Sequence, residues 1–374
     1  MLTKELLQFV QQEKNISMEF VKQVNACEEG DYKVYLYGAG VQKLYVVRFL
    51  QKHGIKICAI LDSFQQGCYK GIPIVLFDDF LRSNPDPKSL FVISAPSVEH
   101  EIREALEGHF PEEQIFCFET SPYVEWIPDV EEYRAYLVEH WDEFSQMYDT
   151  LADARSKETF VNIIKGRISG RTDYFRAVYE PDPYYPKDVV HLSDREVLAE
   201  VGSYDGTTLG NFLRRCPDYK AAYCFEPDSS NLRVLYRAVE RLQQDGKIKV
   251  VPYGAWDHKG TLYFSNSGGA TNLSHVVEER SQSSDCIEVV TVDETIPEPV
   301  TYMTISSNGA EMHVLYGAKQ QIAKNHPKLA VYGSCSGGEF LDIWNYLREL
   351  VPGYRFYLRH HLEHGGIESF LYAV

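Results

Sequence analysis

The chain has 374 residues, and its 54 acidic and 37 basic side chains give a formal net charge of -17. A protein this acidic is not attracted to the phosphate backbone of nucleic acids or to anionic membrane surfaces, so we expect no partner of either kind. At about 150 residues per domain, the length fits two or three domains. With 44% hydrophobic residues the chain has enough apolar material for buried cores, which excludes a disordered protein.

Three features of the sequence concern its cellular compartment. The first residues, MLTKELLQFVQQEK, have the pattern of a charged amphipathic helix and lack the apolar run and cleavage site of a secretion signal. No window approaches the roughly 18 uninterrupted apolar residues of a membrane-spanning helix. The eight cysteines are scattered without a CxxC pair, which indicates buried free thiols rather than disulfides. We therefore expect a cytoplasmic protein.

Residues 1–120 have the pattern of a small α/β domain. Short apolar runs end at Tyr37 and at Asp62, and two later runs cover 90–95 and 114–118. Helical stretches separate these runs, as they do when parallel strands are joined by crossover helices. The sequence therefore predicts a small Rossmann-like domain with a parallel sheet.

A glycine turn, Gly38-Ala39-Gly40, follows the first strand of this domain. Asp62 stands 22 residues beyond Gly40, where dinucleotide-binding folds place the acid that holds a ribose. The turn resembles the nucleotide-binding folds attached to some sugar-modifying enzymes, although Lys43 takes the place of the third glycine. The alternative is a docking or regulatory domain whose glycine turn binds no ligand.

Residues 121–180 are expected to form a helical connector. Apolar positions recur every three or four residues from Val130 to Leu151, which predicts one amphipathic helix. A second helical pattern then leads to the proline-rich loop EPDPYYP, which ends the region. We expect Tyr184 and Tyr185 of this loop near the mouth of a site in the next domain.

Residues 181–374 alternate apolar strands with helical stretches. The order begins with VLAEVG and AAYCFEP and closes with two adjacent strands, YRFYLRH and ESFLYAV. About seven strands with interleaved helices are typical of a doubly wound sheet, and the two closing strands predict an antiparallel edge. This α/β domain is the larger of the two.

The strongest local signal lies at the ends of two consecutive strands of this domain. The first strand runs into EVGSYDG (200–206), and the next ends at Glu226. The glycines let the backbone approach a ligand, Glu200 suits an ammonium group, and Glu226 suits the two hydroxyls of a ribose. The pattern predicts a site for S-adenosylmethionine, with candidate contacts Glu200, Gly202, Ser203, Tyr204, Asp205, Gly206 and Glu226. The alternative is that the glycines only shape a turn and Glu226 caps a helix.

The order of motifs in residues 155–374 resembles the FkbM family of class I methyltransferases. The motifs that carry the resemblance are YYPKDVVHL, VLAEVGSYDGTT, CFEPD, YGAWDHKGTLYF, IEVVTVDE, NGAEMHVLYGA, PKLAV, YRFYLRH and FLYAV. The resemblance implies a Rossmann-like methyltransferase domain that binds S-adenosylmethionine and transfers its methyl group, usually to a hydroxyl of a sugar or natural product. It also implies that the cofactor contacts are Glu200, Gly202, Tyr204, Gly206 and Glu226.

The chain departs from the family pattern at two places. Relatives carry Lys-x-Asp-(Ile or Val)-Glu-Gly-Ala-Glu where this chain has TISSNGAE (304–311). They also commonly carry Tyr-His where this chain has Ser334-Cys335. Groups that could bind a metal or move a proton are thus replaced at Thr304, Ser306, Asn308 and Cys335. We therefore expect no divalent metal at the site.

Methylation of a neutral hydroxyl needs a base, and two candidate catalytic residues remain. Glu311 is retained, but Asn308-x-x-Glu311 also has the pattern of a capping box, which we favour. His313 is suited to proton transfer, or it is a surface residue. The sequence thus predicts an S-adenosylmethionine-dependent O-methyltransferase for a glycan or small-molecule acceptor. The alternative is a catalytically lapsed relative that keeps the fold and acts as a binding or scaffold module.

Overall fold

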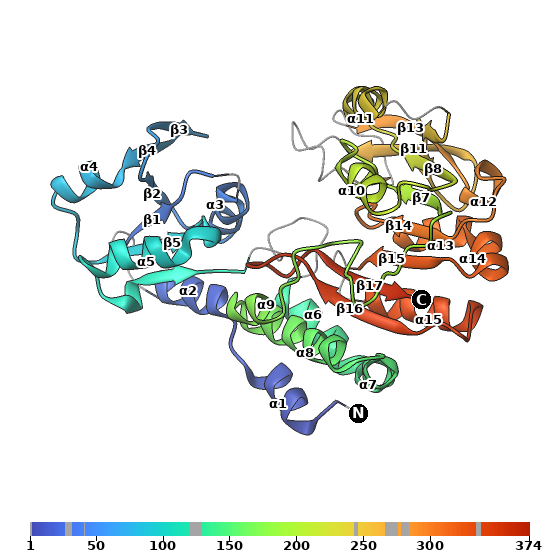
Figure 1. Cartoon of the computed structure of the whole chain (residues 1–374). Coiled ribbons are helices and arrows are strands. Elements are labelled where there is room, and N and C mark those ends of the chain that lie inside the picture. Colours follow the sequence, from blue (N-terminus) through green and yellow to red (C-terminus); the bar gives the residue numbers. More distant parts are fainter. Residues whose placement is uncertain are drawn as a thin grey trace. The chain divides into compact units, whose positions relative to one another are not determined.

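The chain divides into two compact units, whose helices and strands are labelled in Figure 1. The computed structural model describes residues 2–26, 32–40, 42–119, 129–242, 246–265, 276–277, 284–333 and 338–374. The first unit consists of Met1–Asp142, Glu158–Tyr179 and Leu362–Ile367, and the second of Glu143–Lys157, Glu180–His361 and Glu368–Val374. The residues that the sequence assigns to a connector are thus shared between the two units. Ser334 and Cys335 lie outside the described residues.

The first unit is built on a six-stranded sheet with the order β3-β4-β2-β1-β5-β6. Its strands are β1 (Lys33–Tyr37), β2 (Ile57–Asp62), β3 (Gly67–Tyr69), β4 (Ile72–Leu76), β5 (Ser89–Ile93) and β6 (Ile115–Cys117). All neighbours pair in parallel except β3 and β4. The predicted parallel α/β domain is confirmed, and the short β3–β4 hairpin is an addition that the apolar runs did not indicate.

Helices cover both faces of this sheet. Alternate residues of β1 point to opposite sides, so that Val34 and Leu36 belong to one apolar cluster and Tyr37 to another. This alternation follows from the pleat of a strand. The helices of the unit are α1 (Lys4–Gln12), α2 (Ile16–Asn25), α3 (Lys43–Lys52), α4 (Phe77–Arg82), α5 (Glu99–Glu107), α6 (Val130–Glu139), α9 (Asp173–Ala177) and most of α8 (Ala154–Ser169), with 3-10 turns η1 (Pro96–Val98) and η2 (Glu112–Gln114).

The single helix predicted from Val130 to Leu151 is wrong. The helix α6 ends at His140, whose φ of -102° and ψ of 23° lie outside the helical range, and α7 (Trp141–Thr150) begins at the next residue. Both helices keep the predicted apolar face, with Leu137 of α6 and Phe144 of α7 buried. The apolar period therefore continues across the break, which is why the sequence pattern did not show it.

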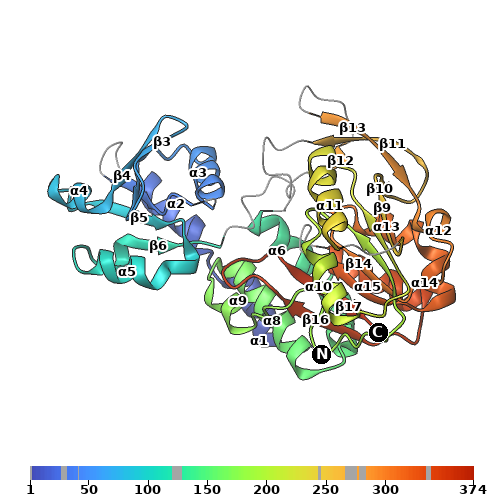
Figure 2. The same cartoon turned by 45° about the horizontal axis from the view of Figure 1, so that its top comes forward.

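The second unit contains a seven-stranded sheet with the order β16-β17-β15-β14-β7-β8-β9. Its strands are β7 (Val197–Val201), β8 (Ala221–Phe225), β9 (Ile248–Val251), β14 (Tyr302–Ile305), β15 (Lys328–Tyr332), β16 (Phe356–His360) and β17 (Ser369–Ala373). The first five are parallel, whereas β17 lies between β15 and β16 and runs antiparallel to both. Figure 2 draws β16 and β17 in red. The predicted doubly wound sheet with an antiparallel edge is confirmed.

The order of these strands reverses at β7. The chain proceeds from β7 through β8 to β9 on one side, and then returns to add β14 and β15 on the other. In open α/β sheets the crevice outside the carboxyl ends of the strands at such a reversal is the usual ligand site. The strand ends that meet there are those of β7 and β14.

Helices and a second small sheet complete this unit. The helices are α7, α10 (Thr207–Arg215), α11 (Ser229–Leu242), α12 (Val292–Thr295), α13 (Glu311–Gly317), α14 (Lys319–Asn325) and α15 (Glu339–Leu350). The small sheet has the order β10-β13-β11-β12, formed by β10 (Gly254–Ala255), β11 (Gly260–Ser265), β12 (Val276–Val277) and β13 (Ser284–Val290). Among the described residues, no helix combines the length and the apolar character needed to cross a membrane.

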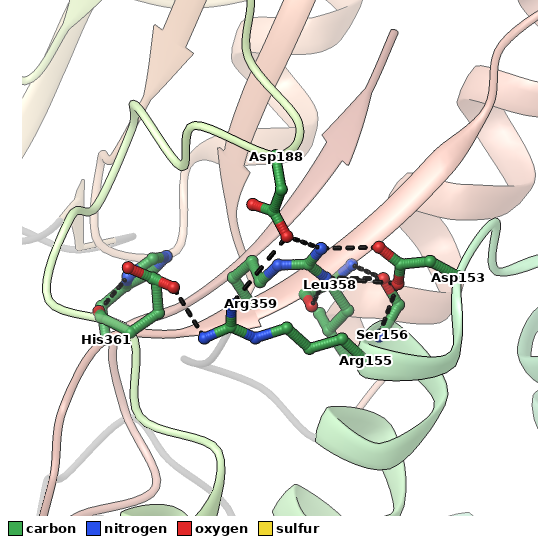
Figure 3. A network of polar contacts seen from close by, with 8 residues as sticks. Asp153, Arg155, Ser156, Asp188, Leu358, Arg359 and His361 are labelled. Carbon is green, nitrogen blue, oxygen red and sulfur yellow. Dashed lines mark hydrogen bonds and ion pairs between the residues drawn. The ribbon is translucent and has the colours of Figure 1, made fainter.

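A buried arginine of β16, at the antiparallel edge of the large sheet, forms ion pairs with two segments that precede the sheet in the chain. Arg359 of β16 is fully buried, and its Nη2 lies 2.6 Å from a carboxylate oxygen of Asp153 and 2.7 Å from one of Asp188. Its Nη1 donates to Ser156 Oγ at 2.8 Å, and Figure 3 shows the guanidinium between these partners. Burial raises the pKa of Asp153, but the hydrogen bonds from Arg359 and Ser156 outweigh it and hold the pKa below its ordinary value.

We expect Asp153→Ala/Asp188→Ala to lower the free energy of unfolding by about 3 to 5 kcal/mol, because it leaves a buried guanidinium without counter-charge. Either single substitution should cost less than half of this, since one carboxylate remains. Urea denaturation followed by circular dichroism measures the losses, with Asp194→Ala, an exposed carboxylate of the same unit, as the control. Strictly additive losses would contradict the shared role of the two carboxylates.

Candidate functional site

A pocket of about 480 Å³ opens at the carboxyl edge of the large sheet in the second unit. Its wall comes from the segments that follow β7, β8 and β14, from the small sheet, and from Tyr184, Tyr332 and Glu368. The volume lies within the range of small-molecule sites. The pocket therefore occupies the crevice that the strand order indicates.

The turn after β7 is shaped by contacts that exclude larger residues. Gly202 has a φ of +84°, and a Cβ atom placed on it would stand 2.0 Å from the carbonyl oxygen of Ser306. Gly206 has a φ of +82° and begins α10, and a Cβ atom there would press on Leu235 and Ala238 at 3.1 and 3.2 Å. Both predicted glycines are thus required by the backbone, and of the two only Gly202 lies in the wall of the pocket.

Glu226 lies in the pocket wall, where the sequence predicts it, and is 4% exposed. Its Oε2 accepts the backbone N–H of Tyr204 at 2.9 Å, and its Oε1 accepts that of Asp228 at 2.9 Å and the side-chain amide of Asn231 at 3.3 Å. Burial raises the pKa of Glu226, against the effect of these donors. The carboxylate is therefore held in one orientation at the pocket, with the adjoining loop fixed to it.

Glu200 does not line the pocket, where the predicted contact with an ammonium group would require it. Its side chain is buried in β7 and is not part of the pocket wall. Burial raises the pKa of Glu200 to about 8, so the carboxyl is mostly protonated at neutral pH. One oxygen accepts from Cys224 Sγ at 3.7 Å, and the other has no hydrogen-bond partner among the described residues.

The other predicted contacts in the turn lie in the pocket wall but also hold the turn together. Ser203 is buried, and its Oγ donates to the carbonyl of Glu200 at 3.3 Å. A carboxylate oxygen of Asp205 accepts the backbone N–H of Thr207 at 2.9 Å, at the start of α10. Tyr204 has a φ of +48° and a side chain that is largely exposed. All three present backbone or side-chain atoms to the pocket.

An apolar part of the wall comes from the small sheet, which the sequence motifs did not indicate. Trp256 follows β10, and Ile287 and Val289 belong to β13. These three side chains pack in one apolar cluster with Ala310. An aromatic and two β-branched side chains of this kind suit the flat apolar face of a purine base.

His313 lies against this apolar wall and outside the pocket. Its ring stacks on Trp256 with centroids 3.8 Å apart and an interplanar angle of 12°. Its Nδ1 lies 2.5 Å from a carboxylate oxygen of Asp257, which also binds His258. Partial burial raises the pKa of Asp257, but these two histidines outweigh it and hold the pKa below its ordinary value. The Asp257–His313 pair thus packs against Trp256, which lines the pocket, although His313 does not line it.

Glu311 is fully buried and does not line the pocket. Its two carboxylate oxygens accept the backbone N–H groups of Ser307 at 2.7 Å and Gly309 at 2.8 Å. The expected capping box is wrong, because Glu311 is itself the first residue of α13 and the cap position is Ala310, which makes no side-chain bond. Glu311 instead closes the loop that follows β14, with Asn308 at a φ of +51°.

The substituted positions leave no charged side chain where the loop after β14 borders the pocket. Ser306, Ser307 and Asn308 line it, whereas Thr304 is buried inside β14. Tyr184 also lines it, while Tyr185 is buried elsewhere in the unit.

The described residues contain no group of three side chains arranged to hold a metal ion. The histidines of the 360–364 segment have separate partners, His360 with Ser369 Oγ at 2.7 Å and His361 with Tyr372 Oη at 2.8 Å. Burial lowers the pKa of His361 to about 4, so this ring stays neutral and packs as part of the core.

A sheet of this strand order, with a glycine turn after its first strand and an acid after its second, has the class I methyltransferase fold. The chain is similar to the crystal structure of methyltransferase FkbM from Methylobacillus flagellatus KT over 98% of this chain and 95% of that one, with a TM-score of 0.79 and 19% sequence identity. This similarity confirms the fold that the resemblance to the FkbM family implies.

A second structure, an rRNA methylase from Streptococcus thermophilus, matches over 54% of this chain and 91% of its own, with 14% identity and a TM-score of 0.30. No protein-family model matches the sequence, and no curated protein matches it. The similarity in three dimensions therefore extends much further than the similarity in sequence.

Removal of the Glu226 carboxylate should weaken binding of S-adenosylmethionine. We expect Glu226→Ala to cost about 1 to 3 kcal/mol, roughly 5- to 150-fold in affinity, if the carboxylate pairs with the ribose. Titration calorimetry measures the change, with Glu240→Ala on the exposed side of α11 as the control. An affinity equal to that of the wild type would reject the ribose contact.

Substitutions at His313 distinguish a ring that packs against Trp256 from a catalytic base. We expect His313→Ala to weaken S-adenosylmethionine binding about 2- to 10-fold, since an aromatic pair contributes about 0.5 to 1.5 kcal/mol. His313→Phe should restore the affinity because it keeps the stacked ring. Calorimetry gives both affinities. A His313→Phe variant that binds normally but transfers no methyl group would instead identify His313 as a catalytic base.

Proposed function

We propose that the protein is an S-adenosylmethionine-dependent methyltransferase that acts on a hydroxyl of a carbohydrate or secondary metabolite. The observation that carries the proposal is the charge of the pocket wall. The described residues that line it include three acids, Asp205, Glu226 and Glu368, and no lysine, arginine or histidine. Such a wall attracts a cationic ligand and opposes phosphate groups, which need positive partners.

The parts of the wall also fit the parts of this cofactor. The apolar side chains of Trp256, Ile287 and Val289 suit the adenine, and Glu226 suits the ribose hydroxyls. The missing Cβ atom of Gly202 lets the loop after β14 lie against the loop after β7, so that backbone borders the pocket between the two strand ends. When bound, S-adenosylmethionine supplies an electrophilic methyl group on a positively charged sulfur.

The acidic wall distinguishes this cofactor from a dinucleotide, which the same type of sheet binds in other proteins. A dinucleotide carries a pyrophosphate that is bound by backbone N–H groups at a helix N-terminus. Here Asp205 stands at the start of α10 and its carboxylate already accepts the N–H of Thr207. A second anion at that point would be repelled.

The neutral loop after β14 favours a second candidate function, a lapsed enzyme that binds the cofactor without methyl transfer. Ser306, Ser307 and Asn308 border the pocket, and none of them accepts a proton at neutral pH. A scaffold or sensor of S-adenosylmethionine would keep the glycine turn and Glu226 while losing the catalytic groups.

Calorimetry with S-adenosylmethionine tests the proposal first. We expect saturable binding to the full chain and none to NAD at the same concentration. The absence of binding at millimolar S-adenosylmethionine would refute the cofactor. Radiolabelled methyl transfer to a panel of methyl glycosides and phenols then separates the two functions, because formation of methylated product supports the enzyme and its persistent absence supports the lapsed relative.

A further inference from the structure

Glu368 stands at the edge of the pocket directly before β17. Its carbonyl accepts the backbone N–H of His361 at 2.8 Å, and the carbonyl of the next residue, Ser369, accepts that of Gly333 at 3.1 Å. The backbone is therefore held by hydrogen bonds at Glu368 itself and at the residue after it. Glu368 nevertheless has a φ of +64°, a left-handed conformation that is uncommon for residues other than glycine and that clusters at functional sites.

Among the described residues, the carboxylate of Glu368 differs from the other acids of the wall in its hydrogen bonding. Asp205 and Glu226 each accept backbone N–H groups of their own loops. No described residue donates a hydrogen bond to the side chain of Glu368. Burial raises the pKa of this carboxyl group, which makes its carboxylate a stronger proton acceptor.

The position of Glu368 in the sheet separates it from the adenosine end of the pocket. β17 lies four strand positions from β8, which carries Glu226 at its end. At about 4.8 Å per strand this corresponds to roughly 19 Å between the two backbones. The wall residues near Glu368 are Tyr184, which interacts with Glu368 and with Ser306, and Tyr332, which pairs with Phe370 of β17. This end of the pocket therefore belongs to the acceptor rather than to the ribose.

Few other groups near Glu368 can move a proton. Burial, followed by the nearby charge of Glu368, raises the pKa of Tyr184, so its hydroxyl stays protonated, and Tyr332 is another phenol. The carboxylate of Glu311 is occupied by backbone N–H groups. Glu368 is thus the carboxylate at the acceptor end that can accept a proton from a ligand.

We propose that Glu368 is the catalytic base of methyl transfer. The acceptor hydroxyl donates a hydrogen bond to the carboxylate of Glu368. Its oxygen forms a bond to the methyl carbon while the bond from that carbon to sulfur breaks. The hydroxyl proton passes to Glu368, and the sulfur keeps the electron pair of the broken bond, so that neutral S-adenosylhomocysteine leaves. This inference rests on the proposed function. It assigns the role of the base to a carboxylate before β17, since the loop after β14 contains no proton acceptor in the pocket wall.

The test compares Glu368→Gln with Glu363→Gln, the same change on a partly exposed glutamate outside the pocket wall. Glu368→Gly serves as a second variant, because glycine adopts a φ of +64° without strain and so guards against misfolding. We expect all three variants to bind S-adenosylmethionine within about tenfold of the wild type by calorimetry, because two of the three acids of the wall and the ribose contact at Glu226 remain in each of them. A loss of more than tenfold in Glu368→Gln alone would make Glu368 a cofactor contact and overturn the proposal.

A crystal structure of the full chain with S-adenosylhomocysteine gives a second readout that needs no acceptor. The sulfur should face an open space bordered by Glu368, Tyr184 and Ser306. A ligand that covers the Glu368 carboxylate, or whose sulfur points away from it, would overturn the proposal.

Methyl transfer to the methyl-glycoside panel gives the third readout. Glu368→Gln and Glu368→Gly should form product about 10²- to 10⁴-fold more slowly, the usual contribution of a general base, while Glu363→Gln keeps the wild-type rate. The wild-type rate should fall with decreasing pH as Glu368 takes up a proton, and this limb should be absent in Glu368→Gln. Equal rates in wild type and Glu368→Gln would contradict the proposal that Glu368 is the catalytic base. A wild type that binds no S-adenosylmethionine would refute the proposed function itself.

Discussion

The candidate site depends on one close contact between two loops of the second unit. Gly202 follows β7 and Ser306 follows β14, and the space between them holds no Cβ atom. Because this approach is possible only at glycine, the ends of two adjacent parallel strands can converge where the strand order reverses. The pocket is consequently bordered by backbone in the middle, and side chains from more distant strands form its two ends.

The two ends of the pocket have different chemistry because different elements supply them. Trp256, Ile287 and Val289 come from the small sheet and make one end apolar. The other end is polar and contains the single acid whose carboxylate the protein itself does not bind, Glu368, among the described residues of the wall. The overall acidity of the chain thus continues into the pocket, although the loop after β14 is neutral.

The local sequence pattern was sufficient to predict the strands of the large sheet and the glycine turn after β7. Apolar runs such as VLAEV form buried parallel strands, and Gly202 and Glu226 border the pocket as predicted, because strand ends and glycine turns are determined by neighbouring residues. The break at His140 was missed because the apolar period continues through it. The sequence did not indicate Trp256 and Glu368 as wall residues, because long-range strand pairing determines their place in the pocket. The contact predicted for Glu200 was wrong in position, because strand alternation does not show which buried carboxyl group reaches the pocket.

The reversed direction of β17 has a consequence for the ligand edge of the sheet. Parallel strands reach the ligand edge with the residues that follow them, so each new group there must precede a helix and share its constraints. β17 arrives at that edge with its first residue, so the group presented there belongs to the segment before the strand and not to a turn that leads into a helix. The chemistry at this end of the edge is therefore determined by a connecting segment, whereas the chemistry at the other end is determined by turns that lead into helices.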